Sequence, residues 1–151
     1  MRASDIYRIR EFDRFYTRIL KLADKYHLNT HLTLLEARVL IEVNRGVGQT
    51  AELTQLLQLD KGYLSRILKK LEDTGLVVRQ KDERDRRFKM LRLTAAGERA
   101  LATIDNRADE QVIRLFGNLS DDELQRLLAA MARIQADVGA ATGVTDPGHS
   151  D

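Results

Sequence analysis

The sequence predicts a mainly α-helical fold with one small β-hairpin, and three features of residues 60–93 carry that prediction. First, four apolar residues recur at the i, i+3, i+4 and i+7 spacing of a helix with one apolar face. These residues are Leu64, Ile67, Leu68 and Leu71. Second, Gly75 lies where such a helix would stop. Third, two short apolar segments follow, and a charge-dense turn joins them.

The helix after Asp60 has a signal at each end. Asp60 is a good N-cap residue, and Gly75 suits the left-handed conformation that often follows the last turn of a helix. Leu76 resumes the apolar pattern as the chain turns. The residues left on the other faces of this helix are Lys61, Gly62, Tyr63, Ser65, Arg66 and Lys69.

The two segments after this helix predict a hairpin of two strands, at about residues 76–80 and 88–93. Its tip, residues 81–87, is too charged to be buried and has no Asn-Gly turn, so we expect a mobile loop of several residues. A helix followed by such a hairpin is the layout of a winged helix-turn-helix DNA-binding domain. In that layout the helix enters the major groove and the loop, or wing, can reach the adjacent minor groove.

Helical spacings predict three helices before this helix. The first is a long helix over residues 4–26. The second follows Thr33, which forms a capping box with the glutamate three residues later, and it should stop near Gly46. The third is short and starts at Thr50. The segment LQLD, residues 57–60, forms the turn that completes the helix-turn-helix.

Two more helices follow the hairpin. Thr94 is the expected cap of a long helix that runs to about Phe116, and Ser120 is the expected cap of the last helix. The last helix starts with three acidic residues at the positive end of its dipole. Residues 139–151 are expected to be a disordered tail.

A chain of 151 residues with 43% hydrophobic residues suits a single domain, which we expect over residues 1–138. Its DNA-binding core should span residues 30–95, with dimerisation helices at 4–27 and 95–138. The terminal helices are apolar on faces that a small core could not fully cover, so a homodimer is expected. Two-fold symmetry would place two recognition helices about 34 Å apart and predicts a palindromic operator. The alternative is that both ends fold back onto their own domain.

Composition excludes several other classes of protein. There is no cysteine, which excludes disulfides, thiol catalysis and cysteine-based zinc sites. The N-terminal residues lack the apolar region of a signal peptide and no run is long enough to span a membrane, so a cytoplasmic protein is expected. Residues 50–94 hold 11 Lys and Arg against 7 Asp and Glu, whereas residues 95–151 hold 5 against 10. A basic middle segment of this kind favours phosphate binding.

Enzyme and metal functions are not indicated by the sequence. It has no nucleophile elbow, phosphate-binding glycine loop or cofactor fingerprint, so we expect neither catalysis nor a cofactor. His27 and His31 are four residues apart, but the residues between them suggest a helix end rather than a helix face. A metal site is therefore not expected there.

Four segments carry a resemblance to a known family. They are LTLLEARVLIEV at 32–43, AELTQLLQLDKGYLSRILKKLEDTGLVVR at 51–79, DERDRR at 82–87 and RLTAAG at 92–97. In this order and spacing they resemble the MarR family of bacterial transcriptional regulators, over residues 5–138. A narrower similarity, through REFDRFYTRIL at 10–20, is to the regulator half of proteins that fuse a MarR-like domain to a GNAT-type acetyltransferase. Only residues 139–151 follow here, so no acetyltransferase domain is expected.

The resemblance implies a set of DNA-binding residues. For the major groove and its flanks they are Thr50, Lys61, Gly62, Tyr63, Ser65, Arg66 and Lys69; for the wing they are Arg84, Asp85, Arg86 and Arg87. Arg66 would read a guanine or clamp a phosphate. Arg87 would enter the minor groove, with Asp85 holding it in position. The alternative is that Arg66 and Lys69 are ordinary solvated charges.

The family resemblance also implies regulation, most often repression, and frequently release by a small phenolic or anionic ligand. That ligand would bind near Phe15, Tyr16 and Arg38, although aromatic residues at helical spacing are more often part of a core. The second functional hypothesis is a dimeric protein-interaction module, or the regulator half of a split acetyltransferase system, with weak DNA binding. Retention of Arg66, Asp85 and Arg87 argues against it.

Overall fold

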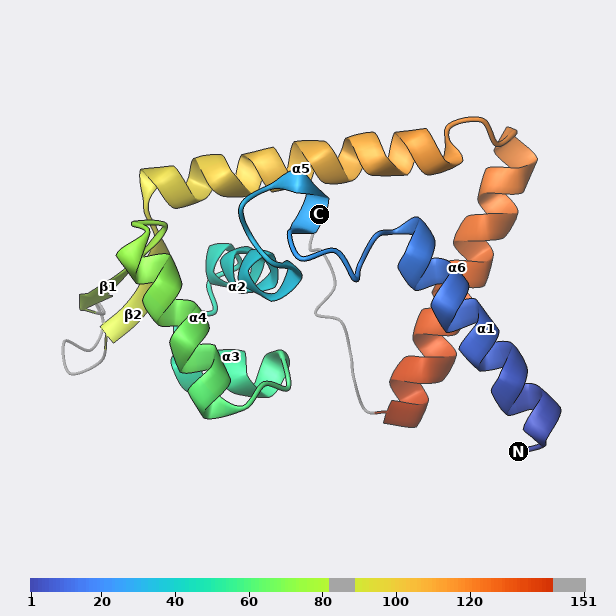
Figure 1. The fold of residues 1–151 in the computed structure, drawn as a ribbon, viewed down its shortest axis with the longest axis horizontal. Helices are drawn as coiled ribbons and strands as arrows, with labels where there is room; N and C mark the ends of the chain where they lie inside the picture. The colour runs from blue at the N-terminus through green and yellow to red at the C-terminus, as the bar shows by residue number, and fades with distance from the viewer. Residues whose placement is uncertain (82–88, 143–151) are drawn as a thin grey trace. The chain divides into compact units, whose positions relative to one another are not determined.

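A computed structural model describes residues 1–81 and 89–142 of the chain (Figure 1). Its elements are α1 (Ala3–Ile19), the 3-10 helix η1 (His27–Asn29), α2 (Leu34–Asn44), α3 (Thr50–Leu56), α4 (Lys61–Asp73), β1 (Val77–Lys81), β2 (Lys89–Leu93), α5 (Ala95–Phe116) and α6 (Asp121–Thr142). The prediction of a mainly helical fold with one hairpin is confirmed. The chain divides into two compact units, Met1–Asp109 and Glu110–Asp151. The single domain expected over residues 1–138 stays a prediction.

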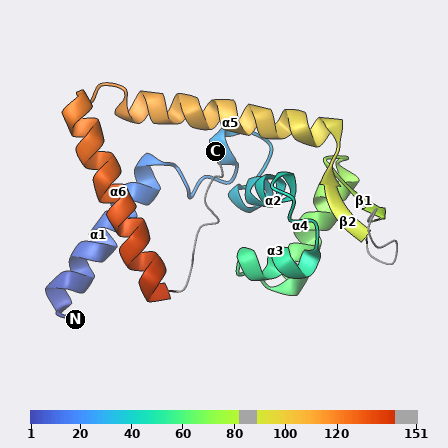
Figure 2. The same ribbon diagram turned by 180° about the vertical axis from the view of Figure 1, so that it is seen from behind.

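The core of the first unit lies where α2, α3 and α4 meet the hairpin, as the two opposite views in Figures 1 and 2 show. Its largest fully buried side chains are those of Leu40, Leu53, Leu64, Leu68, Leu71 and Val39. All four residues of the apolar face predicted for α4 are buried. Burial of a leucine stabilises a fold by about 1.5–3 kcal/mol, so this face fixes α4 on the core.

The start of α2 is held by the predicted capping box. The Thr33 side chain accepts a hydrogen bond from the backbone N–H of Glu36, and the Glu36 carboxylate accepts one from the backbone N–H of Thr33 at 2.9 Å. The two bonds satisfy two N–H groups that have no partner within the helix.

Helices α1 to α4 all end in the same Schellman motif, in which one residue with positive φ reverses the backbone after the last turn. In α4 this residue is Gly75, with φ of 72°. The N–H of Gly75 donates to the carbonyl of Glu72 at 3.0 Å, and that of Leu76 to the carbonyl of Leu71 at 2.9 Å. The corresponding residues that end α1, α2 and α3 are Lys21, Gly46 and Gln58. The predicted stops at both glycines are confirmed.

The predicted length of the first helix is wrong. A helix was expected over residues 4–26, but α1 ends at Ile19. Lys21 takes a φ of 52°, and the N–H of Leu22 donates to the carbonyl of Thr17 at 3.1 Å, which closes the turn. Lysine seldom adopts positive φ, so nothing in the sequence around Lys21 indicated that the helix ends there.

The hairpin is antiparallel, with Val77 opposite Leu93 and Lys81 opposite Lys89. It is tied to the segment between α2 and α3, because the N–H of Leu91 donates to the carbonyl of Gly48 at 2.8 Å. Residues 82–88 are not among the described residues. The mobile tip predicted there, with the wing residues Arg84, Asp85, Arg86 and Arg87, therefore lies outside them.

Thr94 joins the hairpin to α5. Its hydroxyl oxygen accepts the N–H of Gly97 at 3.0 Å, as predicted for a cap, and its O–H donates to the carbonyl of Gly75 at 2.6 Å. Thr94, which directly follows β2, thus bonds both to Gly75 at the end of α4 and to Gly97 in the first turn of α5. This connection sets where α4 lies relative to the strands.

The second unit contains α6, whose start is capped by Ser120 as predicted. The backbone N–H of Ser120 donates to the Glu123 carboxylate at 2.9 Å, and this bond and that of the Ser120 hydroxyl lower the pKa of Glu123. The predicted start of the tail at residue 139 is wrong, because α6 continues to Thr142. Two alanines favour that extension, and the Thr142 hydroxyl donates to the carbonyl of Val138 at 2.8 Å.

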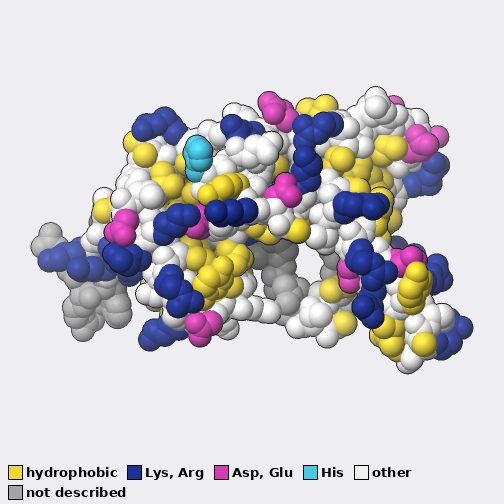
Figure 3. Space-filling view, viewed as in Figure 1, with side chains coloured by type: hydrophobic (Ala, Val, Ile, Leu, Met, Phe, Trp, Pro, Cys, Tyr) yellow, Lys and Arg dark blue, Asp and Glu magenta, His cyan; other side chains and the backbone are white. Residues whose placement is uncertain are grey.

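Both α1 and α6 lack a buried residue along their described lengths. Ile9, Phe12 and Phe15 of α1 are about half exposed, and apolar side chains are visible over α1 in Figure 3. Within residues 1–81 and 89–142, no helix combines the length and the apolar character needed to cross a lipid bilayer.

Candidate nucleic-acid interface

The outward face of α4 carries all six residues that the sequence predicted for it. Because the buried stripe faces the core, all six are exposed, as are Lys70 and Asp73; the six are Lys61, Gly62, Tyr63, Ser65, Arg66 and Lys69. Thr50, at the start of α3, is half-buried. The structure therefore brings the major-groove candidates together on one helix, while the wing candidates lie outside the described residues.

The first turn of α4 is fixed by Asp60, whose carboxylate accepts a hydrogen bond from the backbone N–H of Tyr63 at 2.9 Å. This bond confirms the predicted N-cap. It also places Gly62 and Tyr63 at the end of the helix that carries a partial positive charge, which favours a nearby phosphate.

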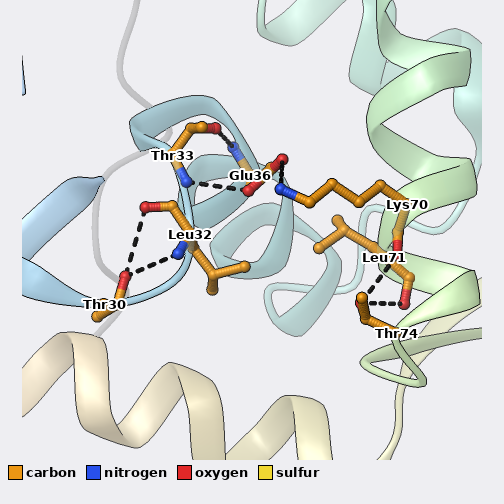
Figure 4. A network of polar contacts seen from close by, with 7 residues as sticks. All are labelled: Thr30, Leu32, Thr33, Glu36, Lys70, Leu71 and Thr74. Atoms are coloured by element: carbon orange, nitrogen blue, oxygen red, sulfur yellow. Dashed lines mark hydrogen bonds and ion pairs between the residues drawn. The ribbon is translucent and has the colours of Figure 1, made fainter. Parts of the chain in front are cut away.

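The last turns of α4 are held by a polar network that the sequence did not reveal (Figure 4). Glu36 is only 5% exposed, yet its carboxylate accepts both the Thr33 N–H and the Lys70 ammonium, the latter at 2.7 Å. A single buried carboxylate thus caps α2 and holds α4. The Lys70 side chain is half exposed and remains in contact with water, whereas the Glu36 side chain is almost fully buried.

Replacing Glu36 tests this clamp. We expect Glu36→Ala to lower the free energy of unfolding by about 2–3 kcal/mol, because it removes two hydrogen bonds to a buried carboxylate. Glu36→Gln should lower the free energy of unfolding by about half as much, since glutamine can still accept the bond of the capping box but cannot form an ion pair with Lys70. Urea denaturation of the purified protein measures both.

The control for this prediction is Asp73→Ala, which removes the exposed ion pair of Asp73 with Lys69. An exposed pair of this kind contributes under about 0.5 kcal/mol. If Glu36→Ala costs no more than Asp73→Ala, the buried clamp does not stabilise the protein.

Cations spread from α4 onto the hairpin, as Figure 3 shows. We call the exposed described members the basic surface: Lys61, Arg66, Lys69, Lys70, Arg79, Lys81, Lys89 and Arg92. Three of them have acidic partners, because Lys69 pairs with Asp73 at 3.1 Å, Lys70 with Glu36 at 2.7 Å and Arg79 with Glu72 at 2.6 Å. Among the described residues, the other five make no ion pair. Those five are available to neutralise phosphates.

Lys81 and Lys89 are candidates that the sequence analysis missed. They face each other directly across the antiparallel ladder, immediately before and after the segment that is not described. Like charges at opposed positions of a sheet repel each other, and a phosphate between them would remove the repulsion. Only the strand register reveals the pair, and a sequence pattern does not supply that register.

Arg66 has a neighbour that is not an acid. Its guanidinium lies over the ring of Tyr63, 5.5 Å from the ring centroid. The two residues are three apart on α4 and so lie on the same side of the helix. This cation–π contact places the charge of Arg66 beside a ring and not beside an acid.

The three residues predicted to bind a ligand do not together line any of the cavities found along α1 or beside α4 in the described part of the chain. Tyr16 stacks on Phe12 with ring centroids 5.5 Å apart, and Phe15 borders an open hollow along α1 that neither Tyr16 nor Arg38 lines. Arg38 is exposed on α2. Burial, and to a lesser degree the charge of Arg38, lowers the pKa of His27. Ligand binding by Phe15, Tyr16 and Arg38 stays a prediction.

A second cavity, of about 340 Å³, lies between the segment before α2, the end of α4 and α5. Its lining includes Thr30, Leu32, Lys70, Thr74, Leu76 and Arg107. The Arg107 guanidinium donates to the backbone carbonyls of Leu28 and Asn29 at one edge of this cavity. No sequence signal predicts it, because its residues come from three distant segments. Within the described residues, no cluster of three or more His, Cys, Asp or Glu side chains could hold a metal ion.

Comparison with known proteins gives a consistent result. Residues 31–87 match the model of the MarR family. A protein of Thauera aromatica that is named for regulation of the hcr operon is 32% identical over 91 residues, which are 60% of this chain and 54% of that protein. This chain spans between 54 and 58% of the length of the curated relatives it matches.

Solved structures of MarR have the same fold. One is 28% identical with a TM-score of 0.59, and the similarity covers 93% of this chain and 92% of that one. A mutant of MarR from E. coli, solved in complex with operator DNA, is 23% identical with a TM-score of 0.62. That similarity covers 83% of this chain and 91% of that chain.

Proposed function

Because this chain belongs to the MarR family of transcriptional regulators, we propose that it binds double-stranded DNA and regulates transcription. The observation that carries the proposal is the exposed face of α4, where side chains suited to base and phosphate contacts project from a helix that is capped and buried on its other side. Regulators of this family are not enzymes, so the prediction that the chain is not an enzyme is confirmed.

The proposed DNA complex has α4 in the major groove. There Ser65 and Arg66 can reach base edges, while Lys61 and Lys69 approach phosphates on either side. Gly62 has no side chain and allows the helix to approach the backbone of the DNA closely. Arg84, Asp85, Arg86 and Arg87 of the wing would occupy the adjacent minor groove.

The protein acts as a homodimer in this proposal. The support is that α1 and α6 bury no residue although both carry apolar side chains. In the second unit, Ile113 is 68% exposed and Val112 and Val138 are about half exposed. Helices of this kind gain stability in water by burying such faces against a partner. A two-fold dimer would read a palindromic operator, and repression is the mode proposed for it.

Release by a small ligand is the last part of the proposal. The 340 Å³ cavity supports it, because that cavity is lined by Lys70 of α4 and by Thr74, the residue that caps the end of α4. A molecule that enters it would contact the end of α4 and disturb the Glu36–Lys70 clamp. Ligand binding would then change how α4 presents its DNA-binding face.

Selection of bound sequences from a random DNA pool tests the proposed function. The purified protein should enrich a palindromic motif, and sedimentation should give a dimer. Enrichment of no motif by a protein that still dimerises would contradict DNA recognition. It would favour the dimeric interaction module, or the regulator half of a split acetyltransferase system.

The wing is tested by Arg87→Ala. We expect about a tenfold loss of affinity for the selected operator, because an arginine in a narrow minor groove interacts strongly with its negative potential. Fluorescence anisotropy with labelled operator measures the affinity, and circular dichroism should show an unchanged fold. Unchanged affinity would remove the wing arginine from the mechanism.

A further inference from the structure

Arg66 stands out among the cations of α4 because its charge rests on an aromatic ring and not on an acid. Lys69 pairs with Asp73 and Lys70 with Glu36, whereas Arg66 makes no ion pair with a described residue. Its guanidinium carbon is 5.5 Å from the centroid of the Tyr63 ring. Among the described residues, the ring of Tyr63 is therefore the group that interacts with this guanidinium.

A cation–π contact holds an arginine without an acidic partner. It uses the charge of the guanidinium and does not pair the five N–H donors with an acceptor oxygen. An ion pair would occupy some of these donors. The contact with Tyr63 therefore orders a long side chain without an acid that competes for the groups that read DNA, and it reduces the rotamer freedom lost on binding.

The ring that supports Arg66 is itself anchored. The backbone N–H of Tyr63 donates to the Asp60 cap at 2.9 Å, and the side chain of Tyr63 is 41% exposed. The space beside the pair is kept open by Gly62. A Cβ atom at position 62 would lie 3.9 Å from Nη1 of Arg66 and 3.1 Å from the Asp60 carboxylate. The first turn of α4 thus holds Tyr63 beside Arg66, and the absence of a side chain at position 62 leaves space next to the guanidinium.

From this geometry we propose that Tyr63 is a positioning residue, which holds the Arg66 guanidinium ready for bidentate recognition of guanine N7 and O6. The inference rests on the proposed DNA-binding function and makes it specific. It assigns a guanine to each half of the operator. A planar, pre-oriented fork matches the two acceptors of guanine in the major groove, whereas a phosphate contact would not need a fixed orientation.

The test uses the operator selected from random DNA, made once with guanine and once with 7-deazaguanine at the position each half-site shares. Tyr63→Phe keeps the ring and removes the hydroxyl, whereas Tyr63→Leu removes the ring. An exposed cation–π contact contributes about two- to fivefold, and each dimer has two. Tyr63→Leu should therefore weaken binding to the guanine operator by about 4- to 25-fold, and Tyr63→Phe by less than about twofold.

Three further results are expected if Tyr63 acts through Arg66. Tyr63→Leu should have little effect on the 7-deazaguanine operator, because that base lacks the N7 acceptor. It should also have little effect when Arg66→Ala is already present. Repeating the selection with Tyr63→Leu should give a motif with a weaker preference at the guanine position.

Two results overturn the inference while leaving the proposed function intact. Equal losses from Tyr63→Leu with and without Arg66 would mean that Tyr63 contacts DNA independently. The second result is that Arg66→Ala leaves the guanine preference of the selected operator unchanged, which would mean that Arg66 holds a phosphate. If the wild-type chain enriches no operator at all, the proposed function fails and the inference fails with it.

Discussion

Replacing Gly97 with alanine should destabilise the protein by about 3 kcal/mol or more, since overpacking of this severity is at or above the usual 1–3 kcal/mol. A Cβ atom at position 97 would lie 2.1 Å from the carbonyl oxygen of Leu76 and 3.4 Å from Cβ of Leu93. The obstacle is backbone, so no side-chain rotation can relieve it. Urea and thermal denaturation measure the loss.

The backbone around Gly97 has little freedom to move away. The carbonyl of Leu76 also accepts the N–H of Thr94 at 3.1 Å, and the Thr94 hydroxyl oxygen accepts the N–H of Gly97. Relief of the clash would require the start of α5 to separate from the hairpin. We therefore expect Gly97→Ala to weaken DNA binding as a result of its instability, because the same connection positions α4.

Gly62→Ala is the matched control, since it places the same methyl group in a helix where it meets only side-chain atoms. We expect its free energy of unfolding to stay within about 1 kcal/mol of the wild type, because alanine favours helix and the contact with the Asp60 carboxylate opposes that gain. Its DNA affinity should still fall, since a methyl group would stand in the approach to the groove. Equal stability of the Gly97 and Gly62 variants would contradict the close packing of α5 on the hairpin.

The sequence predicted those parts of the fold that depend on local chemistry. The buried stripe of α4 follows from its spacing, and the caps at Thr33, Asp60, Thr94 and Ser120 follow from side chains that bond to the next turn. Such signals act over three or four residues, so a sequence pattern contains them in full. For the same reason the exposed face of α4 was predicted residue by residue.

The features that the sequence did not predict depend on unusual backbone or distant contacts. Lys21 ends α1 in a conformation that usually calls for glycine, so periodicity alone extended the helix too far. Glu36 meets Lys70 across 34 positions of sequence, and the stack of Arg66 on Tyr63 depends on rotamers. Helical spacing shows which residues are exposed. It does not show which of the exposed charges are already paired.

DNA affinity should fall by about a thousandfold or more when salt rises from 50 to 200 mM, as expected for a protein that neutralises six or more phosphates. The cations that matter most are those without an acidic partner, because a paired cation must give up its acid before it can gain from a phosphate. Lys81 and Lys89 meet this condition, and their mutual repulsion adds to it. We therefore expect both lysines to contact phosphates.

The double variant Lys81→Gln with Lys89→Gln tests this expectation. It removes four charges from a dimer, so the slope of log affinity against log salt should become shallower by about 3 to 4. Its stability should be unchanged or slightly higher, because a repulsive cross-strand pair is lost. Fluorescence anisotropy at four or more salt concentrations gives the slope, and thermal denaturation gives the stability.

Arg126→Gln with Arg133→Gln is the matched control, since both residues are exposed on α6 and their removal changes the net charge by the same amount. The control should leave the salt slope within about one of the wild-type value, because neither arginine belongs to the basic surface and an exposed charge that touches no phosphate is screened by salt. Equal slopes for the two double variants would mean that net charge, and not a phosphate contact at the hairpin, sets the salt dependence. A slope that falls only for Lys81 and Lys89 would place the ends of the strands beside residues 82–88 against the DNA backbone, next to the major groove that α4 is proposed to occupy.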